Sequence, residues 1–176
     1  MVSFEGLNAD KRYRAGLQDK KTAKANKLSL NTGAKMEKLK WKDEYSVGIE
    51  KIDRQHRHLF EIINKLIDRS AASSDSKLVS ETLTEMLNYA KEHFTTEEEL
   101  MQEYGYPEIG PHKEQHIYFF KTTAELSINA LNKQSMVSSE IVEFLKLWWT
   151  RHILKMDMKY KEFFKAKMSP VAEHSI

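Results

Sequence analysis

The chain has 176 residues, 40% of them hydrophobic and 31% charged, which suffices for one domain with a packed core and an appendage. The absence of cysteine excludes disulfides, thiolate metal sites and iron–sulfur clusters. No apolar run approaches the ~20 residues of a membrane span, and the N-terminal residues lack the apolar core of a secretory signal. We therefore expect a cytoplasmic protein without a membrane span.

The net charge of +2 is unevenly distributed along the chain. Residues 1–40 carry ten basic and four acidic side chains, whereas the remainder has an acidic excess. This composition predicts a basic, weakly ordered N-terminal extension over residues 1–40, with Met36 as an alternative start of the domain. A docking arm for a protein partner is the other interpretation. Nucleic acid is not an expected partner, because no aromatic residues are interleaved with the basic ones.

The rest of the chain has the pattern of a short extended arm and four helices. The arm is expected over residues 41–50 and the helices over about 53–71, 77–103, 111–132 and 136–166. Each helix has apolar residues three and four apart, which form one stripe on its surface. Asp53 is a candidate N-cap for the first helix, and Pro111 is the expected first residue of the third.

Four such helices with short connections favour an all-α fold, an antiparallel up-down four-helix bundle with an N-terminal arm. The domain is expected to span residues 41–168, and residues 169–176 would form a C-terminal tail.

Ionisable side chains interrupt the apolar stripes of all four helices. They are His56 in the first, His93 and Glu97 in the second, His112 and His116 in the third, and His152 in the fourth. Residues four apart lie ~40° apart around a helix, so each pair faces one side. A hydrogen bond ordinarily satisfies one buried histidine, but five histidines and a glutamate in one core require a common partner. Imidazole and carboxylate donors without cysteine indicate iron, manganese or zinc.

Asp157 follows His152 by five residues, which places it ~140° away on a regular α-helix. A π-helical turn between the two would bring them closer, and such turns recur at functional sites. We therefore include Asp157 among the expected metal ligands. His58 lies two residues from His56 and should face solvent, and His174 lies in the tail, so neither is an expected ligand.

The order and spacing of these residues resemble the hemerythrin family, specifically its bacterial hemerythrin-like domain. The resemblance covers residues 41–160. Its motifs are W41…Y45-S-V-G-I49, I52-D53-x-Q55-H56-x-x-L59-F60, H93-F-x-x-E97-E98, Y106-P…H112-x-x-x-H116 and W148-x-x-x-H152-I153-x-x-x-D157. Each motif alone is common, whereas the ordered set is specific.

The resemblance implies a non-haem di-iron centre in the bundle. It assigns His112, His116 and His152 to one iron, His56 and His93 to the other, and Glu97 and Asp157 to the bridge, together with an oxo or hydroxo group. One iron would keep an open position where dioxygen is the ligand. The implied function is reversible dioxygen binding for transport, storage or delivery, without enzymatic turnover.

Two other functions stay open at this point. The domain could be an oxygen or redox sensor that acts through a partner, with residues 1–40 as the contact. It could also be a di-iron enzyme with peroxide, nitric-oxide or ferroxidase activity. Bundle oxidases use carboxylate-rich sites with paired Glu-x-x-His motifs, which this sequence lacks.

Trp149 departs from the family pattern. Three residues before the histidine of the fourth helix, the family commonly has an aliphatic residue near the dioxygen pocket. Tryptophan is bulkier and would narrow that pocket; the alternative is that Trp149 only packs against a neighbouring helix.

Overall fold

A computed structural model describes residues 36–72, 76–132 and 139–168 of the chain. The elements are the 3₁₀ turn η1 (Asp43–Tyr45), the helices α2 (Glu50–Ala72), α3 (Ser76–Tyr104), α4 (Ile109–Asn132) and α5 (Ser139–His152), the π-helical turn η2 (Ile153–Asp157) and the helix α6 (Met158–Met168). These ranges contain no strand. Almost all of the predicted N-terminal extension, the predicted C-terminal tail and His174 lie outside the described residues.

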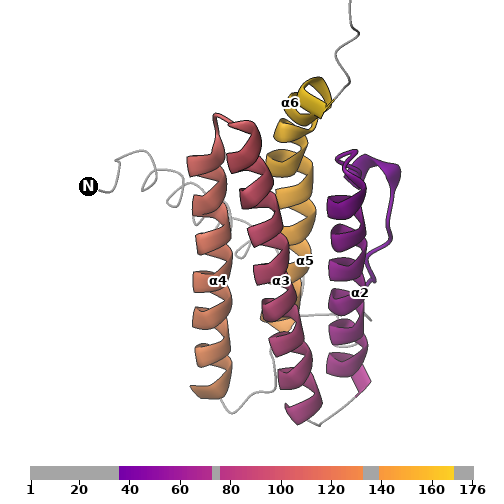
Figure 1. The fold of residues 1–176 in the computed structure, drawn as a ribbon. Helices are drawn as coiled ribbons and strands as arrows, with labels where there is room; N and C mark the ends of the chain where they lie inside the picture. Colours follow the sequence, from indigo (N-terminus) through magenta and orange to yellow (C-terminus); the bar gives the residue numbers. More distant parts are fainter. Residues whose placement is uncertain (1–35, 73–75, 133–138, 169–176) are drawn as a thin grey trace, which may run out of the picture. The chain divides into compact units, whose positions relative to one another are not determined.

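The helices form an antiparallel four-helix bundle. Helices that follow one another along the chain are in contact, and α2 also contacts α5, so the four helices close into a ring. Figure 1 shows α2, α3, α4 and α5 side by side, with α6 continuing the direction of α5. The predicted all-α bundle is therefore confirmed, while the exact domain limits 41–168 stay a prediction.

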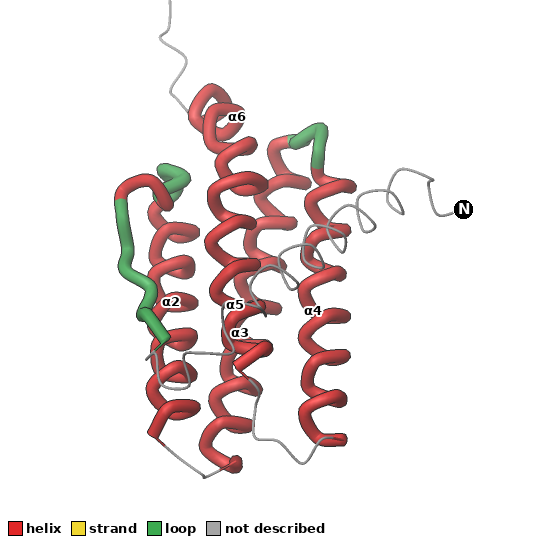
Figure 2. Tube along the Cα trace, turned by 180° about the vertical axis from the view of Figure 1, so that it is seen from behind, coloured by secondary structure: helices red, strands yellow, loops and turns green. Residues whose placement is uncertain are grey.

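Apolar stripes of the helices meet along the axis of this bundle. Leu59, Ile63 and Leu66 on α2 are fully buried, and burying each such side chain stabilises the fold by roughly 1.5–3 kcal/mol. A second cluster, made of Val47, Ile52, Met101, Tyr106, Tyr160 and Phe164, joins the arm to the helices. Figure 2 shows the arm as a loop that runs alongside α2.

Asp53 does not cap the first helix, contrary to the sequence prediction, because α2 already begins at Glu50. Its carboxylate instead binds the arm. The Val47 backbone N–H donates to Asp53 Oδ1 at 2.8 Å, and the Ser46 hydroxyl donates to Oδ2 at 2.5 Å. The aspartate therefore fixes the arm against the start of α2.

Pro111 lies in the first turn of α4 but is not its first residue, which is Ile109. The difference is two residues and has a simple cause. Backbone N–H groups in the first turn have no intrahelical partner, so proline is tolerated there. The His112 N–H then donates to the Glu108 carbonyl at 3.1 Å, which continues the turn into the helix.

Gly105 ends α3 in a Schellman turn. Its φ is +68°, and the Tyr106 N–H donates to the Met101 carbonyl at 2.8 Å while the Gly105 N–H donates to Gln102 at 3.3 Å. Tyr106 and Met101 also pack together in the second core cluster. Because a left-handed backbone favours glycine, this residue determines where α3 stops and how the chain enters α4.

We expect Gly105→Ala to lower the free energy of unfolding by about 1–2 kcal/mol, measured by urea denaturation. An added Cβ at this position meets no atom within 4 Å, so the expected cost lies in the backbone conformation alone. Gly110→Ala is the matched control, since its Cβ is equally unobstructed and its φ is not positive. Equal stability of the two variants would contradict this explanation of the turn.

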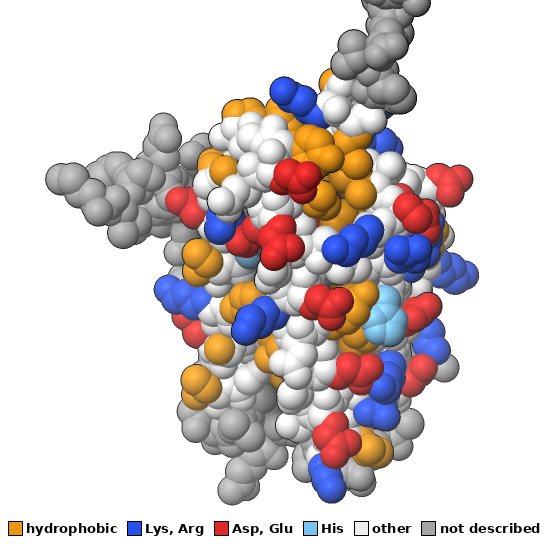
Figure 3. Space-filling model, viewed as in Figure 1, with side chains coloured by type: hydrophobic (Ala, Val, Ile, Leu, Met, Phe, Trp, Pro, Cys, Tyr) orange, Lys and Arg blue, Asp and Glu red, His pale blue; other side chains and the backbone are white. Residues whose placement is uncertain are grey.

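The outer surface carries charges of both signs. Figure 3 shows acidic and basic side chains interspersed over one face, on which histidine occupies little area. No helix in the described ranges combines the length and apolar content that crossing a membrane requires.

Candidate metal centre

All seven side chains that the sequence singles out lie together inside the bundle. They are His56 on α2, His93 and Glu97 on α3, His112 and His116 on α4, His152 on α5 and Asp157 in η2. None is more than 4% exposed. By contrast, the His58 side chain is 47% exposed and pairs with Glu61, as expected for a residue outside the centre.

The donor atoms fall into two groups, within each of which every atom lies within 4.8 Å of the others. The three-histidine group is Glu97, His112, His116 and His152, and the two-histidine group is His56, His93, Glu97 and Asp157. In the first group the Nε2 atoms of His116 and His152 are 3.2 Å apart. Imidazole nitrogens thus converge on a common point, and Glu97 belongs to both groups.

Glu97 directs one carboxylate oxygen to each group. Its Oε2 lies 3.3 Å from His116 Nε2 and 3.4 Å from His112 Nε2. Its Oε1 lies 3.5 Å from His93 Nε2, on the two-histidine side. A carboxylate that bridges two metal ions needs this arrangement of its oxygens.

Asp157 is placed in the same way by the π-helical turn η2. Its Oδ1 lies 3.1 Å from His152 Nε2 and 3.5 Å from His112 Nε2, and its Oδ2 lies 3.3 Å from His56 Nε2. A regular α-helix would turn Asp157 ~140° away from His152. The wider turn over Ile153–Asp157 removes this mismatch, as predicted from the spacing of five residues.

Supporting hydrogen bonds orient two of the imidazoles. Nδ1 of His93 lies 3.2 Å from Gln55 Oε1, and Gln55 Nε2 donates to Thr96 Oγ1 at 3.2 Å. Nδ1 of His116 lies 2.8 Å from Glu98 Oε1. An acceptor at Nδ1 holds the proton there, which leaves the Nε2 lone pair directed at the centre, as a metal ligand requires.

Tyr160 orients the bridging glutamate. Its hydroxyl donates to Glu97 Oε1 at 2.5 Å, and its side chain is fully buried. Burial, together with the negative charge of Glu97, raises the pKa of Tyr160 well above its usual value. The phenol therefore stays protonated and keeps donating its hydrogen bond.

His93 and Glu97 are held in the protonation states of metal ligands. Burial lowers the pKa of His93 to about 3, although Glu97 acts in the opposite direction, so the imidazole is neutral. Burial acts to raise the pKa of Glu97, but His93 and hydrogen bonds with His112 and His116 outweigh it and hold this pKa well below its usual value. Neutral imidazoles and ionised carboxylates are the forms that bind metal.

Unsatisfied polar atoms concentrate at the same place. The buried side-chain atoms that lack a hydrogen-bond partner among the described residues are His56 Nδ1 and Nε2, His93 Nε2, both Asp157 oxygens and Trp149 Nε1. Leaving a carboxylate unpaired in a protein interior is costly. Cations held between these nitrogens and oxygens would offset that cost, so the residues present fit a metal centre.

Three residues that hydrogen-bond to candidate ligands were not predicted from the sequence to have a functional role. They are Gln55, Glu98 and Tyr160. The signal that could have identified them is their position next to the expected ligands. Gln55 and Glu98 are chain neighbours of a candidate ligand. Tyr160 follows Asp157 by three residues, so the two face the same side where η2 continues into α6. Their hydrogen-bond partners, however, come from other helices, which spacing along one helix does not reveal.

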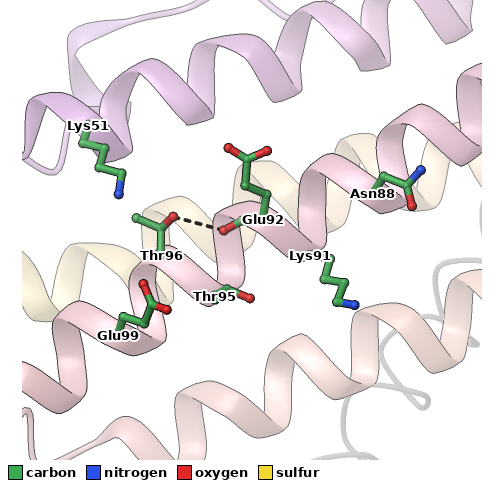
Figure 4. A pocket seen from close by; sticks show the side chains of 7 residues that line it. All are labelled: Lys51, Asn88, Lys91, Glu92, Thr95, Thr96 and Glu99. Carbon is green, nitrogen blue, oxygen red and sulfur yellow. Dashed lines mark hydrogen bonds between the residues drawn. The ribbon is translucent and has the colours of Figure 1, made fainter.

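An open pocket on the surface is separate from this centre. It is lined by Lys51, Asn88, Lys91, Glu92, Thr95, Thr96 and Glu99, none of which belongs to the seven (Figure 4). Thr96 connects this pocket to the centre, since it donates to the Glu92 carbonyl at 3.0 Å and accepts the hydrogen bond from Gln55.

Comparison with known proteins agrees with this geometry. Residues 47–164 match the family described as Hemerythrin HHE cation binding domain. A bacteriohemerythrin of Stenotrophomonas maltophilia is 36% identical over 137 residues, which cover 77% of this chain and 88% of the relative. A myohemerythrin of Theromyzon tessulatum is 34% identical over 125 residues, which cover 71% and 92%.

Solved structures lead to the same fold. The crystal structure of wild-type hemerythrin superposes with a TM-score of 0.64 at 28% identity and covers 70% of this chain and 95% of that one. The family match over residues 47–164 includes the helices that hold all seven side chains, from His56 to Asp157. The chain belongs to the hemerythrin family.

Proposed function

We propose that this chain binds two iron ions in the bundle core and binds dioxygen reversibly at one of them, as a carrier, store or supplier. The two buried carboxylates that each face both histidine groups, Glu97 and Asp157, support this most directly. His112, His116 and His152 would hold one ion, His56 and His93 the other, and Glu97 and Asp157 both, with an oxo or hydroxo group completing the bridge.

Imidazole and carboxylate ligands without thiolate suit iron as well as manganese and zinc, and the similarity to hemerythrins favours iron among them. When bound, the iron pair supplies two redox-active metals that share the electrons needed to bind dioxygen. With Glu97 and Asp157 shared, one ion would have three histidines and the other only two. The two-histidine side therefore has room in its coordination for a small ligand.

Aromatic side chains around the histidines exclude water. The Phe94 ring stacks on His116 at 3.8 Å and on Trp149 at 5.3 Å, and the Phe119 ring contacts Trp149 at 5.4 Å. Phe94, Phe119 and Trp149 are at most 3% exposed. Keeping water and acid from the centre slows loss of a bound ligand by protonation, which reversible binding requires.

The donor composition favours binding over turnover. Five of the seven candidate ligands are histidines, whereas di-iron oxidases of the bundle type use carboxylate-rich sites. We therefore propose no catalytic role. The cytoplasmic location and a protein partner for residues 1–40 stay predictions.

The proposal is tested by optical spectroscopy of the reduced protein. Iron-loaded, dithionite-reduced protein under argon is expected to be nearly colourless and to gain a charge-transfer band when dioxygen is added. Removing the gas should abolish the band, and a second addition should restore it. Metal analysis of the same sample should give two iron ions per chain.

Immediate oxidation without a reversible band would rule out the carrier function while leaving the metal centre intact. A chain that takes up no iron would overturn the whole proposal. Protein loaded with zinc, which has no redox chemistry, serves as the control, because it should show no band under either gas.

A further inference from the structure

Trp149 packs beside the centre, with its ring nearer to His93 of the two-histidine group than to His152, whose ring centroid is 6.4 Å away. Its side chain is fully buried, and its ring lies 5.4 Å from the His93 ring between centroids. Phe94 stacks against it at an interplanar angle of 21°, and Phe119 packs edge-on to it. The indole is thus held among rigid neighbours directly beside one candidate ligand of the ion that has fewer protein donors.

The indole N–H of Trp149 has no acceptor within the part of the chain that the structure describes. Buried indole N–H groups ordinarily find one. The other buried side-chain atoms without a partner in these ranges all belong to His56, His93 and Asp157, which are candidate metal ligands of the two-histidine group. Trp149 is therefore the one member of this set that is not a candidate ligand, and it lies against one.

We propose that the Trp149 N–H donates a hydrogen bond to a small anionic ligand bound on the two-histidine side. This inference rests on the proposed function, since it needs a metal ion there with an open position. Because the Trp149 N–H has no acceptor among the described residues, it would form a hydrogen bond when such a ligand binds. In a dry core that bond is stronger than in water, so Trp149 selects ligands whose outer atom accepts a hydrogen bond.

Azide is a suitable probe, because it is small, anionic and carries an acceptor atom beyond the one that would bind metal. We expect Trp149→Phe, which removes the donor and keeps an aromatic ring, to weaken azide binding to the oxidised iron protein by about tenfold. Trp41→Phe is the matched control and should bind azide as the wild type does. Trp41 lies on the arm, where it contacts Tyr45 and Phe60.

A second measurement starts from the wild type and uses the two variants only to assign the signal. Ultraviolet resonance Raman spectra report whether an indole N–H is hydrogen-bonded. Adding azide to the wild-type iron protein should convert one free indole to a hydrogen-bonded one, and the same change should appear in Trp41→Phe but not in Trp149→Phe.

Equal azide affinity in wild type and Trp149→Phe, or an unchanged indole band in an azide-bound wild type, would overturn the donor role and leave the di-iron proposal standing. A wild-type chain that holds no iron, or whose iron gives no azide spectrum, would overturn both proposals. The two failures are therefore distinguished by the metal content and the azide spectrum of the wild type.

Discussion

His116→Ala is expected to lose at least one of the two iron ions. The Nε2 atom of His116 lies 3.3 Å from Glu97 and 3.2 Å from the Nε2 of His152, in the middle of the three-histidine group. Without the His116 imidazole, the ion of the three-histidine group would keep two imidazoles, His112 and His152, and the carboxylates that it shares with the other ion. Losing only a supporting contact typically costs roughly 10–100-fold in metal affinity, and losing a ligand should cost more. Iron per folded chain, measured by mass spectrometry after desalting, tests this.

Two further variants serve as comparisons for the iron content of His116→Ala. His58→Ala alters an exposed histidine that pairs with Glu61, so its iron content should equal that of the wild type. Glu98→Gln removes the charge beside His116 Nδ1 while keeping an acceptor, and should give an intermediate affinity. Full iron retention by His116→Ala, with its helical content unchanged, would show that His116 is not a ligand.

The apolar stripes and their histidine interruptions made most of this centre predictable. Positions four apart on one helix face the same side in any helix, so His93 and Glu97 follow from local geometry alone. The same argument predicted the π-helical turn, because Asp157 could not otherwise face inward. Such inferences succeed because each depends on a single helix.

Contacts between two different segments of the fold were harder to predict from the sequence. Asp53 has the sequence context of a helix cap, but its carboxylate binds the arm, which the sequence does not place beside it. Tyr160 and Gln55 were missed as functional residues because their partners lie on other helices. The unpaired N–H of Trp149 depends on every neighbour of the ring at once, so packing in three dimensions is needed to recognise it.

The metal-free protein is expected to lose much of its stability between about pH 6.5 and pH 3. In the unfolded chain His93 takes up a proton near its usual pKa of 6.5, whereas burial lowers this pKa to about 3 in the folded protein. The unfolded state thus binds more protons over this window, so the free energy of unfolding falls as the pH falls. For His93 alone the loss is about 5 kcal/mol, comparable with the whole stability of a small domain.

Other groups of the centre modify this slope. The lowered pKa of Glu97 adds to the loss in acid, because the unfolded carboxyl is protonated first. For His112, burial acts to lower the pKa, but its hydrogen bond and charge interaction with Glu97 outweigh this and raise it. This histidine is protonated in both states below its usual pKa of 6.5, so its contribution changes with pH only above that value. Comparison with a variant is therefore needed to isolate His93.

His93→Gln provides that comparison, because glutamine occupies part of the same space without titrating. Urea unfolding of both metal-free proteins, followed by circular dichroism from neutral pH down to about pH 4, gives the two pH dependences. The wild type should lose several kcal/mol more than the variant over this range, since the other buried groups of the centre are present in both proteins. Parallel curves would mean that His93 accepts a proton as readily in the folded protein as in the unfolded chain. The bundle would then not keep the two-histidine group dry, and the exclusion of water on which reversible ligand binding depends would lose its support.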